Sequence, residues 1–337
     1  MNNILITGGA GFIGSNFIRL LLGETNYNIV NIDALSFAGN LKNTQDFAKN
    51  SRYKFINGNI CNKSLINQVI NEYRIDTIVN FAAETHVDRS ILSPSDFIQS
   101  NIVGVEVLLE AVIENQISRF IQISTDEVYG SANLSESFDE GSQLHPSSPY
   151  SASKASADLL IQSFNKSYNT PAVIVRPTNN FGEYQHIEKF IPLAIMCVMN
   201  NKQIPIYGTG ENRRDWLYVG DNCRAILSVL ENGKSGEIYN ISANNEKSNN
   251  EIADIILKYF GKGREMIKFV DDRPAHDFRY SIDSSKIKQE LAWMPVYSFD
   301  EAMNRTILWY INNQSWINNI LNNKNFQEYY KIQYRSV

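Results

Sequence analysis

The chain has 337 residues and a formal net charge of -5, with 43% hydrophobic and 20% charged residues. This composition is typical of a globular protein and excludes a disordered chain, while the length predicts about two domains with enough core to build a cleft. The sequence has no long run of like charges, so we expect neither nucleic acid nor a membrane surface as a partner.

Cysteine usage and hydrophobicity indicate the compartment. Cys61, Cys197 and Cys223 are odd in number and far apart, and they fit neither a disulfide framework nor a CxxC metal clamp. The longest apolar run, residues 190–199, has about half of the roughly 20 residues that span a membrane, and the first residues lack the cationic start of a signal peptide. We therefore predict a cytoplasmic protein with no metal site and no membrane segment.

Short β-rich runs alternate with helical patterns in the first half of the chain, which predicts βαβ units and a parallel sheet. The expected strands are residues 4–7, 29–33, 53–57, 77–82, 120–124 and 172–176. The expected helices of this half include residues 12–23, 63–73 and 97–115.

After residue 176 the pattern loosens into segments punctuated by Asn, Gly and Pro. Helices are expected there at about 189–200, 221–232, 248–260 and 300–313. We predict an α/β fold with a Rossmann-type doubly wound parallel sheet in residues 1–177. Residues 178–337 are expected to form a smaller, mainly ligand-binding α/β domain at the carboxyl edge of the sheet. The boundary is soft, because loops of either half could cross back.

Three glycines at positions 8, 11 and 14 follow an apolar strand and open an apolar helix. Glycine permits a tight turn and lets the backbone approach a pyrophosphate, while the helix N-terminus offers free N–H donors. Asp33 ends the second expected strand, 19 residues past Gly14, where a carboxylate accepts hydrogen bonds from an adenosine ribose and repels a 2′-phosphate. The pattern favours NAD over NADP. A glycine-rich turn beside a solvent-facing Asp is the alternative.

Tyr150 and Lys154 are four residues apart, which on a helix places them on one face with about 6 Å of rise between them. An ammonium near a phenol favours the phenolate, so we expect Lys154 to lower the pKa of Tyr150 toward the range of a useful base. The alternative is an ordinary helix start after Pro149.

Two adjacent carboxylates, Asp126 and Glu127, follow the expected strand at residues 120–124. The carboxyl edge of a parallel sheet is where open α/β folds bind ligands. Adjacent acids in such a site can have their pKa values driven apart, which gives one proton donor and one proton acceptor. A solvated turn is the alternative.

These motifs together resemble the extended short-chain dehydrogenase/reductase superfamily, and five further segments resemble its dTDP-glucose 4,6-dehydratase branch. The segments are residues 82–90, 124–130, 179–182, 214–219 and 272–277, and the resemblance runs from residue 4 to about residue 295. The Asp126-Glu127 pair is the narrowest of these signals, because related sugar-nucleotide epimerases and decarboxylases lack it there and GDP-mannose dehydratases keep only the Glu.

The resemblance implies an enzyme that converts dTDP-glucose into a 4-keto-6-deoxy sugar with NAD retained as a catalyst. Tyr150 would take the proton of the sugar 4-hydroxyl, which Thr125 holds, as hydride leaves C4. Glu127 would then remove the C5 proton while Asp126 protonates the departing 6-hydroxyl. The first domain is then the NAD-binding domain with the catalytic residues, and the second mainly binds the sugar nucleotide.

Further contacts are implied by the same resemblance. The cofactor residues would be Gly8, Gly11, Phe12, Ile13, Gly14, Asp33, Asn59, Ile60, Ala82, Ala83, Tyr150, Lys154 and Asn180. The substrate residues would be Thr85, Thr125, Asn179, Lys189, Pro205, Tyr207, Arg214, Asn249, Arg273 and His276. A lone Arg or Lys among them could instead be a solvated surface cation, and His276 a core histidine.

The sequence departs from the branch at two positions. Asn59 stands where the family usually has an Asp that contacts adenine, so we expect a weaker grip on the cofactor. Glu183 replaces a family proline and is expected to bring negative charge near a diphosphate site.

The alternatives are a sugar-nucleotide 4-epimerase, a 4,6-dehydratase of another nucleoside-diphosphate sugar, and an inactive NAD-binding scaffold. A homodimer through a four-helix bundle is expected, because residues 97–115 and 150–168 carry apolar side chains on more than one face.

Overall fold

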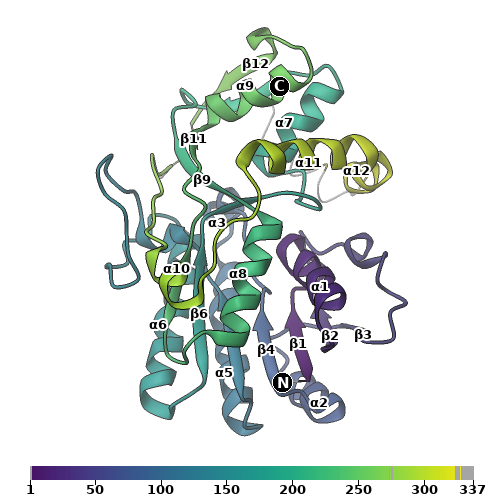
Figure 1. Ribbon diagram of the computed structural model, residues 1–337, viewed down its shortest axis with the longest axis vertical. Coiled ribbons are helices and arrows are strands. Elements are labelled where there is room, and N and C mark those ends of the chain that lie inside the picture. Colours follow the sequence, from purple (N-terminus) through teal and green to yellow (C-terminus); the bar gives the residue numbers. More distant parts are fainter. Residues whose placement is uncertain (1, 273, 275, 323–326, 328–337) are drawn as a thin grey trace.

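A seven-stranded parallel sheet forms the centre of the computed structural model, which describes residues 2–272, 274, 276–322 and 327 (Figure 1). The strand order is β10-β6-β5-β4-β1-β2-β3, and every neighbouring pair is parallel. The strands are β1 (Asn3–Thr7), β2 (Asn28–Asp33), β3 (Tyr53–Asn57), β4 (Thr77–Asn80), β5 (Arg119–Ile123), β6 (Ala172–Pro177) and β10 (Ile238–Ile241). This order reverses beside β1, so the sheet is of the doubly wound, Rossmann type and the predicted fold class is confirmed.

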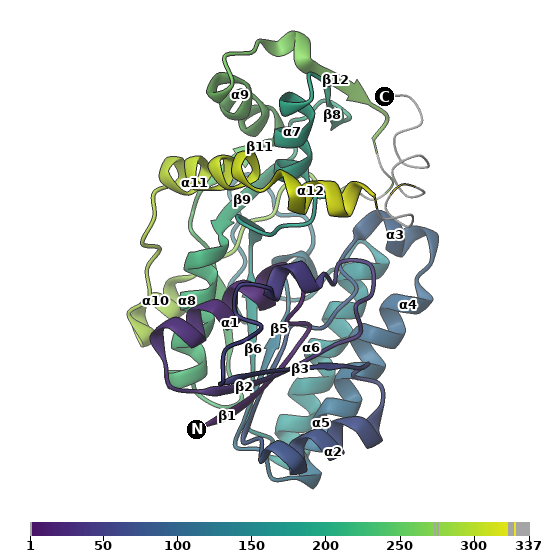
Figure 2. The ribbon, with the colours of Figure 1, turned by 90° about the vertical axis from the view of Figure 1, so that its right-hand side faces the viewer.

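Helices cover both faces of the sheet (Figure 2). One face carries α1 (Phe12–Glu24), α8 (Val219–Asn232) and α10 (Ser285–Leu291), and the other carries α2 (Lys63–Tyr73), α5 (Gly104–Glu114) and α6 (Pro149–Tyr168). Alternate side chains of β1 therefore enter different cores: Ile4 and Ile6 pack into one buried cluster, and Leu5 packs into the other. Burial on both faces explains why the strands are continuous apolar runs in the sequence.

A smaller part of the molecule lies beyond the carboxyl ends of the strands (Figure 1). It has a three-stranded sheet, β11-β9-β7, and a two-stranded sheet, β12-β8. These strands are β7 (Asn179–Phe181), β8 (Ile204–Tyr207), β9 (Arg213–Tyr218), β11 (Glu246–Ser248) and β12 (Ile267–Val270). The helices are α7 (Phe190–Met199), α9 (Asn249–Tyr259), α11 (Phe299–Asn312) and α12 (Gln314–Leu321).

The helix expected over residues 97–115 is interrupted. It comprises α4 (Ser95–Ile98), a π-helical turn at Gln99–Val103, and α5. The turn presents Asn101, which is buried and bonds both the N–H and the C=O of Glu84, and also the hydroxyl of Ser153 on α6. Because π turns insert one residue into a helix, the interruption re-aims a side chain that ties three segments together.

The sheet also takes a strand from beyond residue 177, since β10 pairs with β6. The division into residues 1–177 and 178–337 stays a prediction. Among the described helices, none combines the length and the hydrophobicity that crossing a membrane requires.

Candidate active site

The glycine-rich turn between β1 and α1 forms one end of a cleft at the carboxyl edge of the sheet. Gly8 has a φ of +71°, and a Cβ there would lie 2.6 Å from the backbone N of Ala82. A Cβ on Gly14 would lie 2.6 Å from the carbonyl O of Gly8. Only glycine fits these positions, so the backbone stays bare where a pyrophosphate would approach.

Asp33 lies at the end of β2, is 7% exposed and lines the same cleft. Its carboxylate accepts the backbone N–H groups of Ala10 and Leu35, both at 2.8 Å. These bonds fix the carboxylate against the glycine turn. Each carboxylate oxygen has a second lone pair, so the group can still accept hydrogen bonds from a ribose.

Tyr150 and Lys154 are presented by the first turns of α6. Ser148 caps this helix in a reciprocal capping box with Ser151, and Pro149 occupies its first turn. Both functional side chains are buried and line the cleft. The Nζ of Lys154 donates to the carbonyl O of Ile123, on β5, at 2.5 Å, and burial lowers the pKa of Lys154 to about 8.

The pKa of Tyr150 is not lowered in this structure, and the effect expected of Lys154 stays a prediction. Burial raises the pKa of Tyr150 well above its usual range, and the charge of Glu127 raises it further, against an opposing hydrogen bond from Thr125.

The acid pair stands on the short helical turn η3 (Asp126–Tyr129), directly after β5. Thr125 caps this turn: its hydroxyl accepts the N–H of Glu127 at 3.3 Å and donates to Asp126 Oδ1 at 3.2 Å. Asp126 is 2% exposed, and its Oδ2 has no partner among the described residues. Burial, Glu127 and Asp215 all raise the pKa of Asp126 well above its usual range. The surroundings of Asp126 therefore favour its protonated form.

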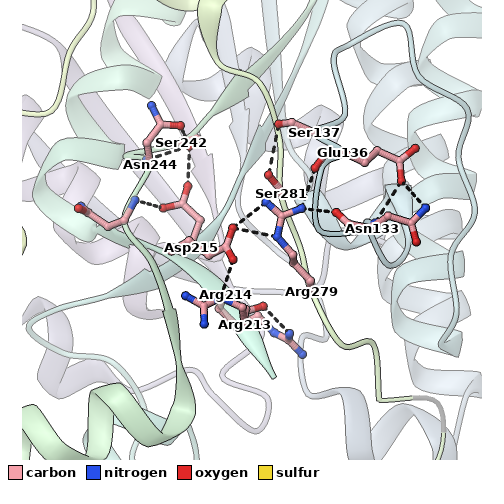
Figure 3. A network of polar contacts seen from close by, with 12 residues as sticks. Asn133, Glu136, Ser137, Arg213, Arg214, Asp215, Ser242, Asn244, Arg279 and Ser281 are labelled. Carbon is pink, nitrogen blue, oxygen red and sulfur yellow. Dashed lines mark hydrogen bonds and ion pairs between the residues drawn. The ribbon is translucent and has the colours of Figure 1, made fainter. Parts of the chain in front are cut away.

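Asp215 is held by its own hydrogen bonds on β9 (Figure 3). It accepts the hydroxyl of Ser242 at 2.5 Å and the N–H of Asn245 at 2.7 Å. Because its position is fixed, its charge acts on Asp126 from a constant distance.

The segment that follows the acid pair is fastened to the smaller part of the molecule by Arg279 (Figure 3). This guanidinium donates to the carbonyls of Asn133 at 2.6 Å and Glu136 at 2.7 Å, and pairs with Glu246 of β11 at 2.7 Å. The acid pair is thus supported from both parts of the chain.

The cleft also contains residues that the sequence did not predict. Glu188 is buried between His186, at 3.6 Å, and His86, at 3.8 Å, and burial raises its pKa to about 7. Gln185 donates to the carbonyl of Asn180 at 2.7 Å, and Trp316 of α12 donates to Asn43 at 2.7 Å. In the sequence, Glu188 could have been found through its position next to Lys189, which is an expected substrate residue. The other missed lining residues include Ser36, Ala38, Gly39, Asn40, Glu84, Ser100, Tyr184 and Ile320.

The cleft brings together all of the residues expected to be catalytic or to bind the cofactor. These are Thr125, Asp126, Glu127, Tyr150 and Lys154, with Gly8, Gly11, Phe12, Ile13, Gly14, Asp33, Asn59, Ile60, Ala82, Ala83 and Asn180. Of the expected substrate residues, it also contains Thr85, Asn179 and Lys189, whose Nζ donates to the carbonyl of Thr85 at 3.0 Å.

Five expected substrate residues do not line this cleft, and their roles stay predictions. Tyr207 donates to Asp88 at 3.1 Å and lies edge-on to His276, which pairs with Asp272 at 2.6 Å. Arg214 donates to the carbonyls of residues 213, 277 and 278 and covers the ring of Tyr280. Pro205 is buried on β8, and Asn249 begins α9. Arg273 lies outside the described residues.

Glu183 does not line the cleft either. The hydroxyl of Tyr218 donates to both of its carboxylate oxygens at 2.9 Å, and Arg305 lies 4.0 Å away. Its charge is thus engaged by Tyr218 and Arg305. Within the described part of the chain, no group of three or more His, Cys, Asp or Glu side chains could hold a metal ion.

Comparisons with known proteins agree with this arrangement. A model of the GDP-mannose 4,6-dehydratase family matches residues 5–306. The chain therefore belongs to this family of nucleotide-sugar dehydratases.

Within the family, the chain is similar to dTDP-glucose 4,6-dehydratases. It is 45% identical to the enzyme of Streptomyces niveus, over 93% of this chain and 94% of that one, and 42% identical to the enzyme of Neisseria meningitidis, over 96% and 97%. Its fold matches the dTDP-glucose 4,6-dehydratase of Bacillus anthracis in complex with NAD, with a TM-score of 0.90, 43% identity and coverage of 95% and 100%. The UDP-glucose 4-epimerase of Thermotoga maritima is 27% identical, with a TM-score of 0.86. The resemblance noted in the sequence is confirmed.

Proposed function

We propose that this protein is an NAD-dependent enzyme that dehydrates dTDP-glucose to dTDP-4-keto-6-deoxyglucose in deoxysugar nucleotide biosynthesis. The observation that carries the proposal is the acid pair, the buried Asp126 and the half-buried Glu127, in one cleft with Tyr150, Lys154 and the glycine turn. An epimerase that shares the cofactor site and Tyr150 has no use for two adjacent carboxylates whose environments differ.

NAD fits the residues present. The bare backbone at Gly8 and Gly14 leaves room for a pyrophosphate, and the fixed carboxylate of Asp33 suits an adenosine ribose without a 2′-phosphate. When bound there, NAD would supply a hydride acceptor for C4 and a hydride donor for C6, and its oxidised nicotinamide would add a positive charge that favours ionisation of Tyr150. Asn59, which also lines the cleft, offers an amide where adenine would lie.

The roles of the chain's own groups are those that the family resemblance implies. Tyr150 takes the proton of the 4-hydroxyl, and Thr125 holds that hydroxyl in place. The resulting 4-ketone acidifies the C5 proton, which Glu127 removes. Asp126, whose pKa is raised by burial and by the charges of Glu127 and Asp215, donates its proton to the 6-hydroxyl, which leaves as water. The ketone is the electron sink that β-elimination needs, so oxidation comes first.

The substrate is proposed to lie between the acid pair and the wall that carries Thr85, Asn179 and Lys189. The ammonium of Lys189 suits a diphosphate. The roles of Arg214, Asn249, Arg273 and His276 toward the diphosphate and nucleoside remain part of the proposal.

The function is tested with purified protein and dTDP-glucose, without added cofactor. We expect a product with the alkali-dependent chromophore of a 4-keto sugar. A C4 epimer would identify an epimerase instead. Binding of NAD without any turnover of nucleoside-diphosphate sugars would support an inactive scaffold, although Asp126, Glu127, Tyr150 and Lys154 are all present. Faster turnover of another nucleoside-diphosphate glucose would identify that compound as the substrate, and the proposed reaction would remain the same.

A cytoplasmic location is proposed on the basis of the cysteines. Cys61, Cys197 and Cys223 are free thiols in the structure. Free thiols suit a reducing compartment.

A homodimer is proposed through the face formed by α4, α5 and α6. Four large apolar side chains of these helices are exposed: Ile98 (51%), Ile113 (41%), Leu159 (57%) and Tyr168 (62%). An apolar face on adjacent helices is typical of a helix-bundle interface.

Replacing Ile113 and Leu159 together by Glu is expected to halve the particle mass in light scattering, because charges would be buried in the interface. Leu134→Glu, at a 76% exposed leucine in the segment after η3, is the matched control and should leave the mass unchanged. A wild-type protein that is monomeric at micromolar concentration would exclude the dimer.

A further inference from the structure

The helix α12 forms part of the wall of the cleft through Trp316 and Ile320, which are 5% and 4% exposed. In both ribbon views α12 lies above α1, on the side of the carboxyl ends of the strands (Figure 1, Figure 2). The indole Nε1 of Trp316 donates to Oδ1 of Asn43 at 2.7 Å, and this bond is buried. Asn43 lies on the short helical turn η1 (Leu41–Thr44) after β2 and also lines the cleft. One buried hydrogen bond therefore joins α12 to the segment that follows β2.

Further hydrogen bonds connect Asn43 to the residues that suit NAD. Its Nδ2 donates to the carbonyl O of Ala10, in the glycine turn, at 2.9 Å. The N–H of Ala10 in turn donates to the carboxylate of Asp33 at 2.8 Å. The carboxylate that suits the adenosine ribose is thus linked to Trp316 through Ala10 and Asn43. This series of bonds places α12 at the ribose and pyrophosphate end of the cleft.

Aromatic packing fixes both partners of the bond between Trp316 and Asn43. The ring of Trp316 lies 5.0 Å from that of Trp309 on α11 and 6.3 Å from that of Tyr184, edge-on in both cases. Tyr184 also lines the cleft, and its φ of +67° is uncommon for a residue other than glycine. The guanidinium of Arg19 lies 3.8 Å from the centroid of the Tyr184 ring and donates to the backbone carbonyl of Asn43. A strained backbone persists where its surroundings determine it, as they do here.

We propose that the hydrogen bond between Trp316 and Asn43 holds α12 over the cofactor end of the cleft and thereby sets how long NAD stays bound. This inference rests on the NAD-dependent function proposed above. Trp316 and Asn43 are positioning residues in this account, because they act through the placement of α12 and of the glycine turn.

Retention of the cofactor serves the proposed reaction directly. The reaction ends with no net oxidation, because the hydride taken from C4 is given to C6 of the same sugar. A site that lost its cofactor between these two transfers would be left with a ketone that it could not reduce at C6. Residues that slow the release of the cofactor therefore keep the two transfers together.

The bond is expected to matter because α12 is short. The helix has eight residues, and a helix of this length is not stable in water by itself. Its position depends on its packing and on its hydrogen bonds to the rest of the molecule. Without Asn43 Oδ1, the indole N–H of Trp316 would be a buried donor with no partner, which favours opening of α12. Local opening of such an element does not require the whole protein to unfold.

The test compares the wild-type protein with Trp316→Phe, which keeps an aromatic ring but removes the N–H, with Asn43→Ala, and with the double variant. Trp293→Phe is the matched control: Trp293 is 6% exposed, its indole nitrogen has no partner among the described residues, and it does not line the cleft. Each protein is loaded with radiolabelled NAD and mixed with excess unlabelled NAD. Rapid filtration then follows the label that stays with the protein, and urea unfolding measures the stability of each variant separately.

We expect Trp316→Phe and Asn43→Ala to release NAD about tenfold faster than the wild type, the size expected when one partner of a buried hydrogen bond is removed. The double variant should release NAD no faster than Asn43→Ala, because that change already removes the bond. Trp293→Phe should release NAD at the wild-type rate.

Wild-type release rates in both Trp316→Phe and Asn43→Ala would overturn the inference. Additive effects in the double variant would also overturn it, since the two residues would then act separately, and so would equally fast release from Trp293→Phe. A wild-type protein that retains no labelled NAD would instead contradict the NAD-dependent function proposed above, so the two failures are distinguishable.

Discussion

Replacing Tyr150 by Phe is expected to suppress the first step of the reaction, whereas Asp126→Asn and Glu127→Gln should leave that step largely intact and slow the second. The reason is that Tyr150 acts on the 4-hydroxyl, while the acid pair acts on C5 and the 6-hydroxyl. A general acid or base is typically worth 10² to 10⁴ in rate. In single turnover with dTDP-glucose, the two acid-pair variants should accumulate the absorbance of the reduced nicotinamide, and Tyr150→Phe should show almost none.

The same variants separate the acid from the base. Only the base must remove the C5 proton, so Glu127→Gln should slow the entry of solvent deuterium at C5 more than Asp126→Asn does. Equal exchange defects, or reduced cofactor in Tyr150→Phe, would contradict the roles assigned here while leaving the fold unaffected.

Removing the guanidinium of Arg176 is expected to destabilise the protein by about 3–5 kcal/mol, because it leaves a buried carboxylate without its partner. Arg176 is 1% exposed and pairs with Asp158, 0% exposed, at 2.8 Å. It also donates to the hydroxyl of Tyr129 at 2.7 Å. The pair thus joins β6, α6 and η3, the last two of which present Tyr150, Lys154 and the acid pair.

Arg176→Met is compared with Arg224→Met by urea unfolding. Arg224 pairs with Glu24 at 2.6 Å, but the two side chains are 41% and 43% exposed, so its loss should cost at most about 1 kcal/mol. The double variant Arg176→Met/Asp158→Leu should recover part of the loss, since no buried charge remains. Similar losses in the two single variants would show that burial of the pair is unimportant.

The sequence predicted the sheet well where the signal is local. β3 and α2 begin and end at the residues expected, because each is a run of one periodicity bounded by turn residues. β10 was missed: it has four residues, and its place in the sheet depends on pairing with β6, as in Ile238 with Ile174. The π-helical turn was missed for a related reason, since it depends on the contacts of Asn101 with Glu84 and Ser153.

The candidate site also has a part that local motifs predict and a part that depends on contacts between distant residues. The glycines, Asp33, Tyr150 and the acid pair occur in compact motifs, and the fold brings them to one cleft. The bond between Trp316 and Asn43 joins residues 273 positions apart, and no spacing rule predicts such a contact. The hydrogen-bond partner of Lys154 is a carbonyl of β5, and its spacing from Tyr150 on one helix does not predict this contact.

The central claim is that hydride removed from C4 returns to C6 of the same sugar while water leaves. Incubation of the purified protein with dTDP-glucose carrying deuterium at C4, without added cofactor, tests this most directly by NMR of the product. We expect a 4-keto-6-deoxy sugar with the deuterium at C6. Deuterium found at C4 of an epimer, or a ketone whose C6 carries no label, would contradict the account.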